Sequence, residues 1–219
     1  MQKYLQILER NPLFRGIESE QLLPMLHCLG AYTNSHKKDS FILMAGDPVR
    51  FIGIIVEGSA LIIKESAEGD RTIIASLTKG DYFAEALCCA GVDSSPVSVI
   101  ATSDTVVLKV EYQRIMNICP DSCGFHPRLV ENMLQILARK NIFMQNRLEV
   151  IGKRTMREKI LSYLRAETTK QGNDIIIPLS RQELADFLNV DRSALSHELS
   201  RMRDEGIIKF RKNHFTLLR

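Results

Sequence analysis

Residues 35–110 consist of short apolar runs separated by turn residues, and this pattern limits the fold more than any other part of the chain. The runs are rich in β-branched side chains: FILM (41–44), FIGIIVE (51–57), ALIIKE (60–65), RTIIASL (71–77), VSVIA (97–101) and TVVLKV (105–110). The breaks are Ala45-Gly46-Asp47-Pro48, Gly58, Glu68-Gly69-Asp70, whose Gly-Asp pair suits a tight hairpin, and Lys79-Gly80-Asp81. Such spacing predicts an antiparallel sheet that is rolled or closed. A generic β-sandwich has the same spacing and stays open at this point.

The hydrophobic period becomes helical after Pro127, because residues 128–151 contain neither Gly nor Pro. One stripe advances by alternating steps of four and three: Val130, Leu134, Leu137, Asn141, Met144, Leu148 and Ile151. Such a seam is typical of a paired helix, in which a lone polar residue, here Asn141, fixes the register. A second stripe lies beside it: Leu129, Met133, Ile136, Lys140, Phe143 and Arg147. We interpret the two faces as contacts with the chain's own sheet and with a second subunit, the alternative being one buried helix in a monomer. Gly152 ends the helix and is the predicted hinge.

Residues 180–218 carry the clearest functional signal. Ser180 and Glu183 form a capping box that begins one helix, and Asp191 caps a second helix after a short turn. Gly206 is the expected left-handed stop of that second helix. Two short strands, Ile207 to Arg211 and His214 to Leu218, follow as a basic hairpin joined by Lys212-Asn213. This order predicts a helix-turn-helix with a wing, and Lys212 is expected to lie on phosphates.

The second of these helices has two chemically different faces. Leu195, Leu199 and Met202 recur at i, i+4 and i+7 and form the expected buried stripe. The opposite face carries Arg192, Ser193, Ser196, His197 and Ser200. Small hydroxyl side chains let a helix lie close to a groove floor, Arg192 can bond guanine through two donors, and His197 can give one. An ordinary helical hairpin with a polar outer face is the alternative.

Charge and cysteine content agree with a cytoplasmic DNA-binding protein. Residues 1–150 hold 15 basic and 17 acidic side chains, whereas residues 151–219 hold 14 and 9, an excess that suits a polyanion partner. The five cysteines are an odd number and predict reduced thiols rather than a disulfide scaffold. No run of eighteen apolar residues exists, and the N-terminus reads as an amphipathic helix, so no membrane partner is expected.

Four segments strongly resemble the family of the cAMP receptor protein and FNR, the bacterial Crp/Fnr regulators. They are KDSFILMAGDPVRFIGIIVEGSALII, EGDRTIIASLTKGDYFAEA, VSVIATSDTVVLKV and SRQELADFLNVDRSALSHELSRM, and the last is highly specific in this order. The resemblance implies an α+β fold: an N-terminal antiparallel β-roll like a cyclic-nucleotide-binding jelly-roll (1–125), a dimerisation helix with its hinge (126–152) and a winged helix-turn-helix (153–219).

The same resemblance implies a homodimer on palindromic double-stranded DNA, together with a contact to RNA polymerase. It implies that Ser180 and Arg181 hold phosphate and that Arg192, Ser193 and His197 read bases; Ser196 is added because it shares their face. An enzyme is disfavoured, because residues 39–110 contain no His.

The sensor departs from the cAMP-binding members of that family. Those members carry a Gly-Glu-Leu turn and then an Arg-Ser pair, where this chain has Ala84-Glu85-Ala86 and Ser95-Pro96. A cyclic phosphate needs that cation and the backbone donors beside it, so no cAMP is expected. The oxygen-sensing branch uses closely spaced N-terminal cysteines, and this chain has none before Cys28, so no iron–sulfur cluster is expected either.

Three other sensor chemistries remain open, and the effector is unknown. Cys88 and Cys89 lie in the loop expected to face a nucleotide phosphate and could be redox-active. Cys119, Cys123 and His126 form a C-x3-C-x2-H run, but zinc usually needs a fourth ligand at a better spacing, so no metal site is assigned. Haem is not excluded. Buried, unreactive thiols are the favoured interpretation of both cysteine groups.

Lys140 and Phe143 complete the candidate effector pocket, with Ala84, Glu85, Cys88, Cys89, Ser95 and Pro96. Lys140 could pair with an anionic effector, although a solvated head group is favoured. The sequence therefore predicts a dimeric, sequence-specific transcription regulator controlled by an effector other than a cyclic nucleotide, or by redox state. The alternatives are an effector-independent regulator with a vestigial sensor and a regulatory subunit of the cyclic-nucleotide type.

Overall fold

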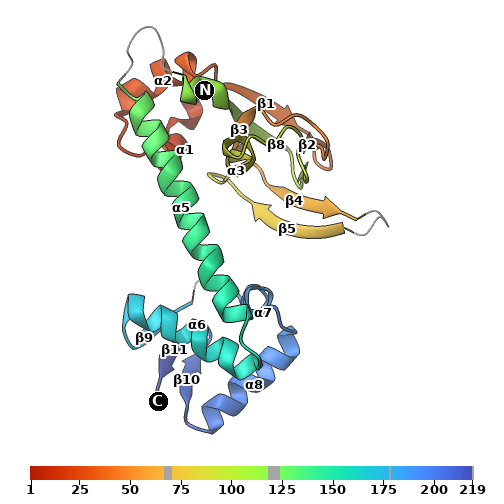
Figure 1. Cartoon of the computed structure of the whole chain (residues 1–219), viewed down its shortest axis with the longest axis vertical. Helices are drawn as coiled ribbons and strands as arrows, with labels where there is room; N and C mark the ends of the chain where they lie inside the picture. The colour runs from red at the N-terminus through yellow and green to blue at the C-terminus, as the bar shows by residue number, and fades with distance from the viewer. Residues whose placement is uncertain (67–70, 118–123, 178, 219) are drawn as a thin grey trace. The chain divides into compact units, whose positions relative to one another are not determined.

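The computed structural model describes residues 1–66, 71–117, 124–177 and 179–218 (Figure 1). The chain divides into two compact units, Met1–Ala138 and Arg139–Arg219. This boundary falls inside the long helix, which was predicted to be a segment of its own between the two domains. No helix in the described part of the chain combines the length and the apolar character needed to cross a bilayer.

Two antiparallel sheets form the first unit, as the apolar runs predict. One sheet has the order β1 (Tyr32–His36), β8 (Thr105–Glu111), β3 (Phe51–Glu57) and β6 (Tyr82–Phe83). The other has the order β2 (Phe41–Leu43), β7 (Ser98–Ala101), β4 (Ala60–Glu65) and β5 (Arg71–Leu77). Every predicted run contains a strand, while β1 and β6 were not predicted. The predicted Gly69-Asp70 turn lies outside the described residues, although β4 and β5 do pair in antiparallel fashion.

Strand β3 is apolar from Phe51 to Val56 because it separates two cores. Ile52, Ile54 and Val56 face a core that is shared with the N-terminal helices. Ile55 points the other way, into the space between the two sheets. A Cβ atom on Gly53 would lie 2.2 Å from the Phe83 ring, so only glycine fits this close approach.

Short helices cover the outer face of the first sheet. They are η1 (Gln2–Tyr4), α1 (Leu5–Glu9), η2 (Pro12–Phe14), α2 (Ser19–Cys28), α3 (Glu85–Cys89) and α4 (Tyr112–Met116). The long helix α5 (His126–Ile151) packs Leu129, Met133 and Ile136 into the same core, as its second stripe predicts. The buried Asn132 amide also donates to the carbonyls of Leu13 and Arg15, which ties α5 to the N-terminal segment.

The second unit contains the predicted helix-turn-helix. Its elements after α5 are α6 (Met156–Gln171), β9 (Asp174–Ile176), α7 (Arg181–Leu188), α8 (Arg192–Asp204), β10 (Ile208–Arg211) and β11 (His214–Leu217). The strands form a sheet in the order β10-β11-β9. The last turn of α5 contributes Val150 to the core of this unit. A capping box between Thr155 and Glu158 begins α6, a local signal that the sequence analysis overlooked.

Candidate nucleic-acid interface

Helix α7 begins at the predicted capping box. The Ser180 hydroxyl accepts from the Glu183 N–H, and the Glu183 carboxylate accepts from the Ser180 N–H at 2.6 Å. These bonds hold the pKa of the Glu183 carboxyl below its usual value. Leu184 and Leu188 are buried, and Asn189 ends the helix with a left-handed φ of 52°. The turn that follows sets the direction of α8 relative to α7.

Helix α8, which we call the recognition helix, is oriented by its buried stripe. Leu195, Leu199 and Met202 are almost completely buried in the core of the second unit. Asp191 caps the helix by accepting from the Ala194 N–H at 2.8 Å. Gly206 follows the helix with a φ of +71°, which confirms the predicted stop.

The four predicted base-reading side chains are therefore all exposed along the N-terminal half of the recognition helix: Arg192, Ser193, Ser196 and His197. The Ser196 hydroxyl donates to the Arg192 carbonyl at 3.0 Å, and Ser200 donates to the Ser196 carbonyl at 3.1 Å. These bonds hold the hydroxyls against the helix, so they add little height to this face. The surface is thus low, polar and flanked by a guanidinium.

An ion-pair network that the sequence analysis missed ties α6 to the recognition helix. Arg157 bonds Glu198 at 2.6 Å and reaches Glu205 through two nitrogens at 2.6 and 2.9 Å. The two carboxylates raise the pKa of the Arg157 guanidinium above its usual value. The bidentate pair restricts the rotation of α8 about its own axis. No short sequence spacing indicates it, since Arg157 and Glu205 are 48 residues apart.

The wing is the hairpin of β10 and β11, and Arg181 is bound to it. The Arg181 guanidinium lies 5.6 Å from the Phe210 ring centroid and 5.5 Å from that of Phe215, and it donates to the Lys212 carbonyl at 3.2 Å. Partial burial lowers the pKa of the Arg181 guanidinium. Ser180, Arg181 and Lys212 thus come together at the start of α7 and the tip of the wing. Of these predicted phosphate contacts, Ser180 and Lys212 are exposed and Arg181 is half-buried.

The predicted dimer seam on α5 is exposed in its middle and C-terminal part. Leu134, Met144 and Leu148 are 63%, 50% and 60% exposed. Asn141 is also exposed, Leu137 and Ile151 are half-buried, and Val130 packs partly on the first core. An apolar helical stripe of this kind is a candidate contact surface.

The candidate effector residues do not all lie as predicted. Cys88 and Cys89 belong to the short helix α3, not to a loop. The Cys88 sulfur lies 3.3 Å from the Phe51 carbonyl oxygen, and burial raises the pKa of its thiol from 9.0 to about 12. Burial also raises the pKa of the Cys89 thiol. A depressed pKa is what activates a thiol, and burial shifts the pKa of both thiols in the opposite direction. The other candidate thiols, Cys119 and Cys123, lie outside the described residues.

The other candidate effector residues are divided between the two units. Ala84 begins α3 with a φ of 67°, and Glu85 is buried in its first turn. Ser95 is buried and exchanges backbone hydrogen bonds with the turn at Gly46 and Asp47, while Pro96 and Lys140 are exposed. Phe143 was predicted to line the effector pocket, but its ring lies 5.7 Å from that of Phe187 in α7.

Lys109 is a cation of the β-roll that the sequence analysis did not single out. It is 8% exposed, and its Nζ lies 4.2 Å from the centroid of the Phe51 ring. Its position in β8 places it on the same face as Val107, which belongs to the core between the sheets. Burial lowers the pKa of the Lys109 ammonium, and a contribution from Asp47 opposes that shift.

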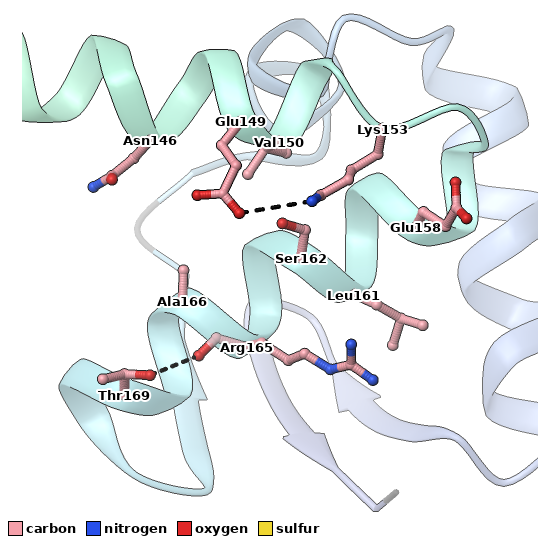
Figure 2. Close-up of a pocket in the computed structure, with 10 residues that line it drawn as sticks. All are labelled: Asn146, Glu149, Val150, Lys153, Glu158, Leu161, Ser162, Arg165, Ala166 and Thr169. Carbon is pink, nitrogen blue, oxygen red and sulfur yellow. Dashed lines mark hydrogen bonds and ion pairs between the residues drawn. The ribbon is translucent and has the colours of Figure 1, made fainter.

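An open groove of about 700 Å³ lies between the end of α5 and α6 in the second unit (Figure 2). Lys153 in this groove pairs with Glu149 at 3.6 Å, and the Thr169 hydroxyl donates to the Arg165 carbonyl. Its lining mixes both charges and includes none of the predicted effector residues. This groove therefore does not match the predicted effector pocket.

A β-roll joined by a long helix to a winged helix-turn-helix defines a class of DNA-binding regulators that carry both domains on one polypeptide. Family models agree: one for the cyclic nucleotide-binding domain matches residues 33–122, and one for the Crp-like helix-turn-helix domain matches residues 158–219. The chain belongs to the Crp/Fnr family of DNA-binding transcription regulators. Members of this family regulate transcription, so family membership agrees with the prediction that the chain is not an enzyme.

Individual relatives are distant. The transcriptional activator protein FnrL of Cereibacter sphaeroides is 24% identical over 187 residues, which cover 81% of this chain and 72% of FnrL. The regulator CLP of Xanthomonas campestris, described as responsive to c-di-GMP, has a TM-score of 0.57 at 15% identity, covering 92% of this chain and 100% of CLP. The catabolite activator protein of Thermus thermophilus has a TM-score of 0.53 at 18% identity, covering 94% and 93%. At these identities the two solved structures show the fold alone.

Proposed function

We propose that the chain acts as a homodimer in the bacterial cytoplasm, where it recognises a palindromic DNA sequence and regulates transcription in response to a signal received by the β-roll. The observation that carries this proposal is the orientation of the recognition helix. Its buried side, Leu195, Leu199 and Met202, turns Arg192, Ser193, Ser196 and His197 outward together. In helix-turn-helix proteins the N-terminal residues of the second helix reach base edges in the major groove.

Each exposed side chain suits a specific task in that groove. Arg192 carries the donors for a bidentate contact to guanine, and His197 can supply one hydrogen bond. Ser193 and Ser196 permit close approach of the helix backbone. Ser180, Arg181 and Lys212 would hold phosphates on either side and fix the register without reading sequence. Arg181 would do so from its stacked position on the wing, where its side chain is already ordered.

The test is DNA binding by the full-length protein and its Arg192→Ala variant. A binding sequence is first selected from random duplexes, and each base pair of the selected site is then varied in turn. We expect a palindromic preference, and we expect Arg192→Ala to cost about 1–3 kcal/mol at one base pair of each half-site while the other positions keep their discrimination. Arg165→Ala, which removes an exposed arginine of α6, is the matched control and should leave the preference unchanged.

Two results would contradict this assignment at different levels. Uniform weakening across all sequences, with a smaller salt dependence, would make Arg192 a phosphate contact only. Absence of any salt-sensitive preference, under both oxidising and reducing conditions, would remove the DNA-reading function itself.

A dimer is supported by the exposed seam of α5. Leu134, Met144 and Leu148 present an apolar stripe at the spacing of a paired helix. Two recognition helices related by a two-fold axis would meet successive major grooves about one helical turn apart. Contact with RNA polymerase would follow from binding near a promoter.

An effector in the β-roll is supported by Lys109. An ammonium that is 8% exposed against an aromatic ring is costly to bury, and the Asp47 carboxylate offsets only part of that cost, because the pKa of Lys109 remains lowered. This residual charge favours a small anionic effector over the vestigial-sensor alternative. Native mass spectrometry and absorption spectra of protein purified without added ligand would reveal a retained anion or a haem. Identical masses for native and denatured-and-refolded protein, with no visible absorption, would favour the effector-independent alternative.

A further inference from the structure

One arginine of α6 holds the recognition helix at two points. The Arg157 guanidinium bonds the Glu198 carboxylate at 2.6 Å, and it bonds the two carboxylate oxygens of Glu205 at 2.6 and 2.9 Å. Glu198 lies in the middle of the recognition helix, and Glu205 is its C-cap. Two helical turns separate these glutamates, so they lie on one side of the helix, about 10 Å apart along its axis. A single side chain therefore restrains both the rotation and the tilt of the helix.

The position of Arg157 is itself fixed by the cap of α6. The Thr155 hydroxyl accepts from the Glu158 N–H at 3.2 Å, and the Glu158 carboxylate accepts from the Thr155 N–H at 3.0 Å. These two bonds close the first turn of α6, which carries Arg157. The anchor of the recognition helix thus starts from an ordered stretch of backbone.

The ion pairs are partly shielded from water. The side chains of Arg157 and Glu198 are 30% and 17% exposed, and that of Glu205 is 37% exposed. The hydrogen bonds from Arg157 hold the pKa of the Glu205 carboxyl below its usual value, so this pair stays ionised at neutral pH. Salt screens partly buried charges less than fully exposed ones, so the contact persists at the ionic strength of a cell.

The apolar side of the recognition helix restrains its rotation less sharply. Leu195, Leu199 and Met202 hold the helix on the core by a hydrophobic effect that has no direction. Side chains extend about 5–6 Å from a helix axis, so a rotation of about 20° displaces their ends by about 2 Å. A hydrogen bond needs about 2.7–3.2 Å between its heavy atoms, so a displacement of this size breaks it. The directional bonds of Arg157 oppose such a rotation.

We propose that Arg157 determines DNA specificity as a positioning residue: acting through Glu198 and Glu205, it fixes the rotation at which Arg192 and His197 reach base edges. This inference rests on the DNA-reading function proposed above. The two kinds of residue differ in what their loss does. A reading side chain affects the base pair that it contacts, whereas Arg157 affects every base pair that the recognition helix reads.

The test compares base discrimination by full-length wild type, Arg157→Ala and Arg157→Lys on the palindrome selected as above, with each base pair varied in turn. A good bidentate contact discriminates between bases by about 5-fold to 150-fold. We expect Arg157→Ala to lower discrimination by about fivefold or more at all the base pairs that the wild type reads in each half-site.

The lysine variant separates position from charge. Arg157→Lys keeps the positive charge, and therefore the salt dependence of binding, but a lysine lacks the planar pair of donors that engages Glu205. It should lower discrimination at the same base pairs as Arg157→Ala. Wild-type discrimination in Arg157→Lys would reduce the role of Arg157 to its charge and would overturn the proposal.

Arg165→Ala is the matched control, because it removes the same charge from an exposed position on the same helix. It should leave discrimination at every base pair unchanged. The measured quantity is a ratio of affinities for two sequences, so a smaller folded fraction does not alter it. Arg157→Ala that weakens binding to all sequences equally would therefore overturn the proposal.

Glu205→Gln covers the case in which Arg157→Ala fails to fold. It removes the charge of the more exposed carboxylate and leaves the bond between Arg157 and Glu198 in place. Discrimination should fall at the same base pairs, and unchanged profiles in both Glu205→Gln and Arg157→Lys would refute the assignment. A wild type without any preferred sequence would remove the DNA-reading function together with this inference. A wild-type preference that the Arg157 variants retain would remove this inference alone.

Discussion

Truncation of Leu148 tests whether the exposed seam of α5 is a dimer interface. Leu148 is 60% exposed in the protomer, although its position in the seam predicts that a second subunit covers it. Leu148→Ala removes most of the apolar surface and keeps the helix, because alanine is the best helix former. The variant should therefore fold normally and dimerise poorly.

The magnitude follows from the exposed fraction. Burying a whole leucine side chain contributes about 1.5–3 kcal/mol, so the exposed share of Leu148 corresponds to about 1–2 kcal/mol for each copy. A two-fold interface contains the residue twice, which gives about 2–4 kcal/mol for each dimer. The dissociation constant of the dimer should accordingly rise by about 30-fold to 700-fold.

Sedimentation equilibrium over a range of protein concentrations measures this constant directly. Ile176→Ala is the matched control, because Ile176 is a 52% exposed apolar residue on β9, away from the helix. It should leave the constant within about twofold of the wild-type value, since scattered surface truncations have small effects. Equal dissociation constants for Leu148→Ala and Ile176→Ala would refute the reasoning, and so would a wild-type protein that is monomeric at micromolar concentration.

Three further predictions concern single side chains. Leu195→Ala should lower the free energy of unfolding by about 2–5 kcal/mol, because the Leu195 side chain is fully buried. Ser196→Ala, at the next position, should change that free energy by no more than about 0.5 kcal/mol. Denaturant titration measures both. Ser180→Ala should cost about 1 kcal/mol in the same assay through loss of the α7 cap, and Ser180→Thr should restore most of it. Native Cys88 should resist alkylation near neutral pH, because burial raises the pKa of its thiol to about 12. The buried, neutral Cys88 thiol contributes to stability below pH 9.0, the pKa of an unshifted thiol, and this contribution is lost as the pH rises toward 12. Denaturation midpoints that stay constant between pH 9.0 and 12 would contradict this prediction.

The strands and caps could be predicted because their signals are local. A β-branched run such as FIGIIVE needs only its own residues to favour a buried strand, and Ser180 and Glu183 are three residues apart. The missed strands lack such signals. The sequence of β1, YTNSH, is mostly polar because its side chains are largely exposed at a sheet edge, and β6 has two residues.

The contacts that sequence reasoning missed join distant parts of the chain. Arg157 and Glu205 are 48 residues apart, and Cys28 and His126 are 98 residues apart. Nothing in the neighbourhood of either partner indicates the other, since a surface arginine and an isolated cysteine are both common.

Lys109 shows how register decides the meaning of a residue. In the run TVVLKV a lysine would ordinarily be a solvated edge residue. In the structure it pairs with Tyr32 on one side and with Gly53 on the other, so it occupies a central strand. Its neighbours Val107 and Phe51 lie toward the core between the sheets. The composition of the run does not fix that register, so the buried cation could not be predicted from it.

Contacts on both sides of Gly152 determine what a hinge at that position would require. Arg147 donates to the Phe187 and Asp186 carbonyls at 3.2 and 3.0 Å, and Val150 is buried in the core of the second unit. Gly152 therefore lies within the second unit, because the chain contacts that unit both before and after it.

Bending at Gly152 would break those contacts. A hydrogen bond to a charged group contributes about 1.5–3 kcal/mol, and exposing a buried valine costs about the same. A ligand must supply about 5.5 kcal/mol of differential binding to move a two-state equilibrium from 1:99 to 99:1. Two such hydrogen bonds and one valine together amount to about 4.5–9 kcal/mol, which would consume most or all of that free energy. A hinge at Gly152 thus predicts that hydrogen exchange in peptides spanning residues 143–152 and 183–188 rises when the protein releases DNA. If both peptides stay equally protected in free and DNA-bound protein, residues 139–151 move with the recognition helix as one body, and the bend must lie elsewhere in α5.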